Sequence, residues 1–390
     1  MKCMTDLIFP AIVVVGFNRL HTLERLLDSL LVADYPSGKK IPLIISLDYC
    51  VEEGANQVKE FADSVHWPYG SKEIILHSCR LGLKEHILRC GDLTEKYDSV
   101  IVLEDDLFVS PAYYRYSIDA LKFFQDDDRI AGISLYSHKS NPCLYRDFEP
   151  LHGGGDNYFL QFASSWGQVW SRKHWREFRD WYDQGQVVHV DDPLPDEVIA
   201  WPETSWLKFF IKYMVVCDKF FVYPRVSLST NFGDPGTHFR GYISFFQVPI
   251  LTQGKKYNFI SLCDSLAVYD AFFELFPEVL NKIIEKYRVE DYAVDLYGKK
   301  SPAKVGAAKV LTTQQCELFD HSYGKKMVPL LLNVIFNIPG EGIYFAPTEC
   351  IIEEKKDDAE KKGIVKRIYS IFSYYISSLI SKGKEFSRCR

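Results

Sequence analysis

The first third of the chain alternates between short apolar runs and longer stretches with helical spacing. The apolar runs predict strands that are buried on both faces, and the stretches between them predict amphipathic helices. The predicted strands are 11–17, 42–47, 73–77 and 99–103, and the predicted helices are 22–31 (with Thr22 as its cap), 58–65 and 84–97. This order predicts an α/β domain with a Rossmann-like, mixed but mostly parallel sheet and helices on both faces.

The pattern changes after the first third. Glycine and serine loops and a series of tryptophans occupy residues 153–206, and a strand-like run covers 220–229. Beyond residue 260 the pattern is mixed, and near the end a charged run precedes an apolar stripe at helical spacing. We therefore expect a main domain over 1–260 with halves at 1–120 and 121–260, a C-terminal extension over 261–350 that is helical in character, and a charged linker with an amphipathic tail helix over 351–390.

The composition is that of an ordinary globular protein, with 47% hydrophobic and 25% charged residues in a chain of 390. The net charge of -6 excludes nucleic acid binding over a broad surface, because phosphate backbones need a basic footprint. The ten cysteines form no C-x-x-C pair and no cluster at zinc spacing, which indicates reduced thiols in a cytoplasmic protein. The apolar run over 7–17 contains Pro10 and predicts a buried strand, and no run approaches the ~18 residues of a membrane span.

Polar side chains follow three of the predicted strands. Arg19 and Asp48 come after the first two, and Glu104-Asp105-Asp106 follows the fourth directly. Open α/β sheets bind ligands beyond the carboxyl ends of their strands, so we expect these side chains to converge. Carboxylates there supply the oxygens that Mg²⁺ or Mn²⁺ prefers beside substrate phosphates and water. Alternation along an extended segment places Glu104 and Asp106 on one side. The alternative interpretation is an acidic cluster at a helix start.

The segment Val100–Tyr114 (VIVLEDDLFVSPAYY) resembles the metal-binding segment of the N-acetylglucosaminyltransferase I family and of related bacterial capsule and polysaccharide glycosyltransferases with the GT-A fold. Val15–Arg19 and Ile44–Asp48 are similar to segments that contact the nucleotide, and His86 matches a donor-contacting histidine. These matches cover about residues 8–120 in order. The resemblance implies a GT-A domain whose first half binds a nucleotide sugar.

The resemblance also implies an inverting transfer from a nucleotide-sugar donor, UDP-linked, to a glycan or lipid-linked acceptor in surface polysaccharide synthesis. Asp106 would ligate Mn²⁺ or Mg²⁺, which neutralises charge on the departing diphosphate. Glu104 and Asp105 would contact the donor sugar and the ribose. Arg19 and Asp48 would hold the nucleotide.

Two later segments extend the resemblance. Ser164–Trp170 (SSWGQVW) is similar to the acceptor-side loop of the bacterial enzymes, which makes Trp166 the candidate acceptor platform. Tyr223–His238 is similar to their segment that ends near the diphosphate, which makes His238 a candidate ligand of the metal or the leaving phosphate. The alternative interpretation is that this lone histidine is structural.

One departure from the family concerns the general base. The family has an Asp next to a Trp after the acceptor loop, whereas this chain has Trp201–Leu207 (WPETSWL). An inverting transfer needs a carboxylate that takes the proton of the acceptor hydroxyl. Glu203 is the nearest candidate, with Asp196 and Glu197 next, and the alternative for Glu203 is a solvated loop residue.

Two other functions stay open at this point. A catalytically inactive sugar-binding or scaffold protein of the same fold is favoured by the missing Asp. A nucleotidyltransferase would use a similar fold and metal site, but it normally has a glycine-rich basic loop after the first strand, and residues 16–20 (GFNRL) are poor in glycine.

The tail over Gly363–Ser381 predicts an amphipathic helix with an apolar stripe and flanking lysines. Such a helix is typical of peripheral contact with the inner face of a membrane, where basic residues meet anionic headgroups. The alternative is that it packs on its own domain or on a second subunit.

Overall fold

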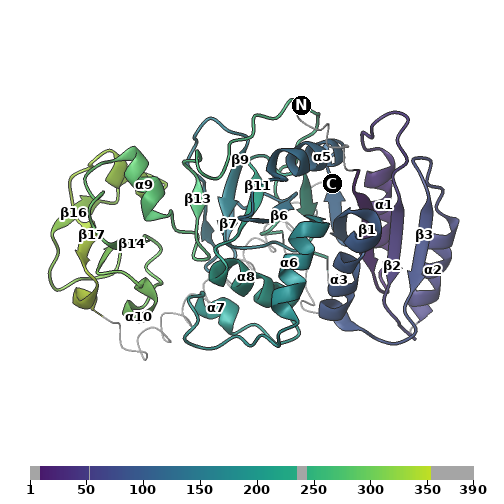
Figure 1. Cartoon of the computed structure of the whole chain (residues 1–390), viewed down its shortest axis with the longest axis horizontal. Helices are drawn as coiled ribbons and strands as arrows, with labels where there is room; N and C mark the ends of the chain where they lie inside the picture. Colours follow the sequence, from purple (N-terminus) through teal and green to yellow (C-terminus); the bar gives the residue numbers. More distant parts are fainter. Residues whose placement is uncertain (1–8, 52, 235–243, 353–390) are drawn as a thin grey trace, which may run out of the picture.

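The computed structural model describes residues 9–51, 53–234 and 244–352. A nine-stranded sheet forms the main body, in the order β13-β9-β11-β6-β10-β4-β1-β2-β3 (Figure 1). The strands β1, β2, β3, β4, β6 and β11 run in one direction, and β9, β10 and β13 run in the other. Their bounds are β1 Ala11–Gly16, β2 Leu43–Leu47, β3 Lys72–Leu76, β4 Ser99–Glu104, β6 Ile130–Ser134, β9 Asn157–Leu160, β10 Gln168–Ser171, β11 Phe220–Pro224 and β13 Val268–Tyr269. The predicted mixed, mostly parallel sheet is confirmed.

Helices cover both faces of this sheet, as predicted. On one face α3, α6 and α8 pack together and against β1, β4, β6 and β10. On the other face α1 packs on α2, and rings of α5 contact β9 and the segment after α1. The bounds are α1 Leu20–Leu31, α2 Glu53–Ser64, α3 Gly82–Asp92, α4 Thr94–Tyr97, α5 Tyr113–Phe124, α6 Arg172–Tyr182, α7 Asp196–Ile199 and α8 Trp206–Val216.

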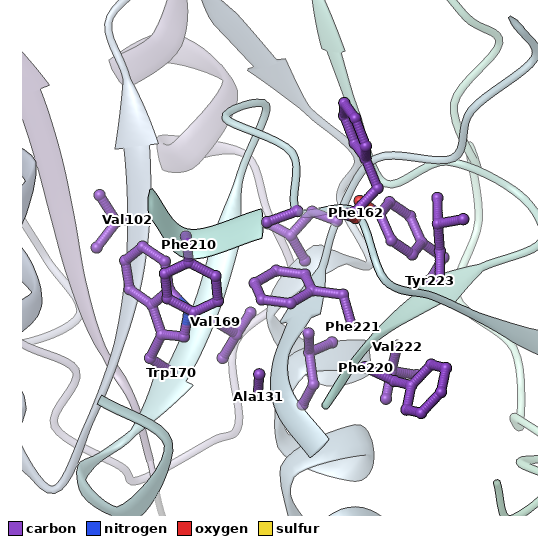
Figure 2. Close-up of a cluster of buried hydrophobic side chains, with 14 of the residues drawn as sticks. Val102, Ala131, Phe162, Val169, Trp170, Phe210, Phe220, Phe221, Val222 and Tyr223 are labelled. Carbon is purple, nitrogen blue, oxygen red and sulfur yellow. The ribbon is translucent and has the colours of Figure 1, made fainter. Parts of the chain in front are cut away.

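The centre of the sheet is a dense aromatic and aliphatic core. Figure 2 shows Trp170 of β10 beside Phe210 of α8, with Phe221 of β11 next to them. All three side chains are fully buried. Because β10 runs antiparallel between β4 and β6, this core ties the two halves of the main domain together.

Two local predictions are wrong. Thr22 is not the cap of α1: the helix begins at Leu20, and the Thr22 hydroxyl donates to the backbone carbonyl of Arg19 at 3.0 Å, inside the first turn. The strand-like run over 220–229 is divided, because the chain leaves the main sheet after Pro224. A separate strand, β12 (Ser229–Asn231), pairs with β5 (Leu107–Val109) instead.

The C-terminal extension also differs from the prediction. The last strand of the main sheet, β13, comes from beyond residue 260, where the main domain was predicted to end. The sequence did not reveal this strand, because two residues are too few to show a periodic pattern. The extension itself is built on a four-stranded sheet, β14-β15-β17-β16, rather than on helices, and it lies at one end of the molecule (Figure 1). Its elements are α9 Pro277–Ile283, β14 Tyr292–Asp295, α10 Pro302–Val305, β15 Lys309–Thr312, β16 His321–Gly324, α11 Leu331–Ile335 and β17 Gly342–Pro347.

A buried charge network joins the extension to the main domain. Lys300 pairs with Asp270 at 2.5 Å, and the Glu274 carboxylate accepts from the backbone N–H of Tyr297 at 2.6 Å. The pKa of Glu274 is raised to about 8, chiefly by burial and also by nearby Asp295, while Lys300 opposes the rise. Three carboxyl groups here, those of Asp270, Glu274 and Asp295, face the one ammonium group of Lys300, so a proton on Glu274 reduces the excess of negative charge.

Within the described ranges, no helix has the length and hydrophobicity needed to cross a bilayer. The eight cysteines among those residues are all free. The linker and the predicted tail helix, like His238, lie outside the described residues.

Candidate active site

The carboxyl ends of the parallel strands meet at one edge of the main sheet. β1 leads to Arg19 and β4 leads to the acidic motif, and these strands are direct neighbours in parallel register. Arg19 forms an ion pair with Asp105 and lies 3.5 Å from Asp106. Two polar strand ends that the sequence singled out are therefore in contact.

The acidic motif lies on a turn, which changes how its side chains point. β4 ends at Glu104, Asp105 and Asp106 form the turn, and β5 follows at once. Asp105 and Asp106 both lie within ion-pair distance of Arg19. The expectation that Glu104 and Asp106 share a side rests on strand alternation, which does not continue through a turn, and it stays a prediction. The helix-start interpretation is excluded, since α5 begins only at Tyr113.

Burial and mutual repulsion perturb the acidic motif. Burial raises the pKa of Glu104 well above its usual range, and the neighbouring Asp106 and Asp105 raise it further. Burial also raises the pKa of Asp105 to about 6, against the opposing effect of Arg19. The Oε1 atom of Glu104 is buried and has no hydrogen-bond partner within the described part of the chain. A single guanidinium thus faces three carboxyl groups, and such a site favours an additional positive charge.

Asp48 directly follows β2, and His86 lies within α3, but both side chains are engaged in contacts within the protein. The Asp48 carboxylate accepts from the backbone N–H groups of Tyr49, Leu81 and Gly82 at 2.8, 2.8 and 3.0 Å. His86 is buried, with its Nε2 2.8 Å from the hydroxyl of Ser46, and burial lowers its pKa to about 4. In this arrangement the Asp48 carboxylate fixes the turn before α3, and His86 connects α3 to Ser46 of β2.

The tryptophan of the acceptor-side loop lies next to the acidic motif. β10 begins at Gln168 opposite Val102, two residues before Glu104, so the loop that precedes Gln168 lies at the carboxyl end of β4. The half-buried Trp166 accepts from the Ser229 hydroxyl through its backbone carbonyl at 2.5 Å. This hydrogen bond attaches the loop to β12.

The segment that precedes His238 runs along the same edge. β12 pairs antiparallel with β5, so Asn231 lies opposite Leu107, and the N–H of Phe232 donates to the Asp106 carbonyl at 3.2 Å. Arg25 of α1 pairs with Asp234, and its guanidinium lies 3.6 Å above the Phe232 ring. Sequence analysis missed this clamp, since an arginine within a helix gives no signal of a partner so distant in the chain.

Of the general base candidates, Glu203 is the one attached to this edge. Its backbone carbonyl accepts from Lys84, in the first turn of α3, at 2.7 Å. Its carboxylate pairs with the buried Lys208 at 2.6 Å, and its side chain is 63% exposed. Asp196 pairs instead with Lys304 of the extension. Glu203 thus lies beside the start of α3, the helix that follows β3, whereas Asp196 lies beside the extension.

Sequence analysis also missed Gln168. Both polar atoms of its side chain are buried without a hydrogen-bond partner in the described part of the chain, and the residue sits beside the acidic motif at the start of β10. The signal available was its place directly after the Ser-Ser-Trp-Gly loop, where a fully polar side chain enters a buried strand.

The donor set fits a divalent cation held by one carboxylate. The described residues contain no group of three or more His, Cys, Asp or Glu side chains arranged to hold a metal ion. Mg²⁺ and Mn²⁺ in nucleotide sites commonly use one or two carboxylates, substrate phosphates and water. Asp106, whose side chain is 20% exposed, can supply that one carboxylate.

We compared the chain with protein families, curated proteins and solved structures. No protein-family model matches the chain. The chain is similar to an alpha-1,3-mannosyl-glycoprotein 2-beta-N-acetylglucosaminyltransferase of Arabidopsis thaliana, at 23% identity over 260 residues, covering 62% of this chain. It spans half the length of that curated relative, 50%.

Solved structures overlap with the chain only in part. TarS of S. aureus (residues 1–349) has a TM-score of 0.35 at 12% identity, covering 56% of this chain and 59% of that one. The mannosyltransferase PcManGT of Pyrobaculum calidifontis, in complex with GDP-Man and Mn²⁺, has a TM-score of 0.30 at 14% identity over 49% and 51%. GalNAc-T7 with UDP, GalNAc and Mn²⁺ has a TM-score of 0.36 at 13% identity over 57% and 43%.

The resemblance expected from the motifs is thereby confirmed: the chain is similar in sequence to the N-acetylglucosaminyltransferases, which are GT-A glycosyltransferases, and it has the mixed α/β architecture that this resemblance predicts.

Proposed function

We propose that the chain transfers a sugar from a nucleotide-sugar donor, UDP-linked, to a glycan or lipid-linked acceptor, with inversion at the anomeric carbon and with the help of a divalent cation. The observation that carries the proposal is the acidic motif at the carboxyl edge, where, among the described residues, three carboxyl groups face the single guanidinium of Arg19. The surplus of carboxyl groups suits a site that receives a cation together with a diphosphate.

The residues have separate tasks in this proposal. Asp106 would hold Mn²⁺ or Mg²⁺, which supplies charge neutralisation on the departing diphosphate. Glu104 and Asp105 would contact the donor sugar and the ribose. Arg19 would balance the motif in the free protein and hold the nucleotide in the complex. Asp48 would shape the nucleotide side through the turn that its carboxylate holds.

The acceptor side would be formed by the loop around Trp166 and by Glu203. The acceptor hydroxyl attacks the anomeric carbon, the bond to the diphosphate oxygen breaks, and a carboxylate takes the hydroxyl proton. Glu203 is proposed for this step over Asp196 because Lys84 and Lys208 attach its loop at the edge that carries the motif. His238 stays a proposed ligand of the metal or the leaving phosphate, and His86 a proposed support of the donor site.

The direct test is release of UDP from a panel of UDP-sugars in Mn²⁺, with and without acceptor, for the full chain and for Asp106→Asn. Loss of turnover and of calorimetric Mn²⁺–UDP binding in a folded Asp106→Asn protein supports the proposal. A variant that keeps both would overturn it. Asp119→Asn is the matched control, because Asp119 pairs with Arg115 on the surface of α5.

The second candidate is a sugar-binding protein without transferase activity. The observation in its favour is that Glu203 is exposed and paired with Lys208, while no Asp stands beside either Trp of WPETSWL. Binding of UDP-sugars without any release of UDP would favour it.

A further inference from the structure

A row of aromatic side chains starts at Trp166 and ends in rings that are exposed at the surface. The Trp166 and Phe246 rings are 4.9 Å apart between centroids, and Phe246 is 5.2 Å from Phe245. Tyr145 completes the row, 5.4 Å from Phe245 and 6.1 Å from Phe246. We call these four residues the aromatic row. They come from three segments that are far apart in the sequence, so no single local motif produces the row.

The outer half of the aromatic row is exposed. Tyr145 is 65% exposed and Phe245 is 46% exposed, whereas the inner rings are partly buried. Packing alone does not explain the outer rings, because the hydrophobic stabilisation of a side chain scales with the area it removes from water. By contrast, the neighbouring Tyr136 is buried and donates its hydroxyl to the Phe246 carbonyl at 3.0 Å, as expected for a structural ring.

Tyr145 also has a backbone conformation that its side chain disfavours. Its φ is 53°, in the left-handed region where glycine and asparagine are common and bulky residues are rare. The residue lies at the turn between β7 (Ser140–Asn141) and β8 (Arg146–Asp147). A large, exposed ring at a strained position points to a use for the ring, since strain of this kind collects at functional sites.

We propose that the aromatic row extends the acceptor platform into a stacking surface for successive pyranose rings, so that the acceptor is an oligosaccharide rather than a single sugar. The face of an aromatic ring carries partial negative charge, and the C–H groups on one face of a pyranose carry partial positive charge. A pyranose therefore stacks favourably on an aromatic ring. The row begins beside the acidic motif, at the residue already proposed for the acceptor, and it continues through three further rings to the exposed Tyr145. This inference rests on the proposed function for the identity of Trp166 as the inner end.

The test uses the full chain on a printed array of defined oligosaccharides, from monosaccharides to hexasaccharides. The variant is Tyr145→Asn with Phe245→Ala, because asparagine keeps the left-handed backbone while removing the ring. The matched control is Phe319→Ala with Phe336→Ala, two rings of the extension that are 45% and 61% exposed. Thermal unfolding of both proteins is measured alongside.

We expect wild-type binding to strengthen with oligosaccharide length, and the row variant to bind the longer glycans about tenfold more weakly, as for the loss of two stacking contacts. The control should bind as wild type does, and the row variant should unfold at a temperature no lower than the control. Equal binding by the row variant and wild type, or no binding of any oligosaccharide by wild type, overturns the inference. Glycan binding without UDP release from any UDP-sugar would instead refute the transferase while leaving the row in place.

Discussion

Replacing Arg19 with methionine tests the electrostatics of the acidic motif. Arg19 pairs with Asp105 and lies 3.5 Å from Asp106, while Glu104 is close enough to interact with all three charges. Methionine keeps much of the apolar stem but removes the only positive charge found beside the motif in the described chain. The free protein should therefore lose stability by an amount that depends on pH.

The magnitude follows from the pKa of Asp105. With a folded pKa of about 6 against about 3.9 in the unfolded chain, ionised Asp105 already costs the native state about 3 kcal/mol. Without Arg19 the pKa of Asp105 rises further, so the native variant keeps Asp105 protonated at pH 7. Because the unfolded chain releases this proton at pH 7, keeping it costs the native state about 4 kcal/mol. The variant should lose about 1 kcal/mol at pH 7, and the loss should grow by up to about 1.4 kcal/mol for each further pH unit.

The sign follows from the raised pKa. An acid whose folded pKa lies above its unfolded value stabilises the protein least at high pH, because the unfolded chain releases the proton first. The penalty in the Arg19→Met variant should therefore vanish near pH 6 and be largest at pH 8. Mn²⁺ should restore part of the loss, since a cation bound at Asp106 replaces the missing charge.

The assay is urea unfolding at pH 6, 7 and 8, with and without Mn²⁺. Arg115→Met is the control. Arg115 makes an exposed i,i+4 ion pair with Asp119, and such a pair contributes at most about 0.5 kcal/mol to stability. An Arg19→Met protein that loses no more stability than the control at pH 8, or whose loss is the same at all three pH values, would refute the reasoning.

Three further predictions concern other parts of the chain. Glu203→Gln should lower turnover by about 100-fold or more with little change in donor binding, whereas Asp196→Asn should not, and the reverse result would transfer the base to Asp196. Glu274→Gln keeps an oxygen that accepts from the N–H of Tyr297. This substitution should raise stability by about 1–3 kcal/mol at pH 8 but not at pH 5, because the raised pKa of Glu274 makes its ionisation costly in the native state. Thermal unfolding at pH 5 and at pH 8 checks this. Truncation after residue 353 should abolish co-sedimentation with anionic liposomes, and equal partitioning of both forms would exclude the membrane helix.

The first half of the main domain was predictable from the sequence because its signals are local. β1, β2 and β4 are continuous apolar runs, and the polar groups at their ends follow directly in the chain. The extension was harder to predict because its four strands have only four to six residues each and its helices are short. A short strand gives too few positions for alternation to stand out from chance.

The candidate site was predictable in its components and not in its contacts. The sequence singled out Arg19, Asp106 and Trp166, and all three lie at the expected edge. It did not reveal that the Asp48 carboxylate binds the turn before α3, or that the buried side chain of Gln168 has no hydrogen-bond partner among the described residues. These facts depend on which strand lies next to which, and periodicity within one segment carries no information about strand order.

The order of buried strands and the acidic run after one of them are written in consecutive residues, so the sequence by itself determined the α/β class and the place of the metal-type motif. Tertiary structure decided the partners. Arg19 meets Asp105 across 86 positions of chain. Trp166 meets Phe246 because β12 hydrogen-bonds both to the Trp166 carbonyl, through Ser229, and to the N–H of Val248, through Thr230. The physical reason is that strand and helix periods arise from local backbone geometry, whereas contacts between distant segments arise from register, turns and packing of the whole sheet.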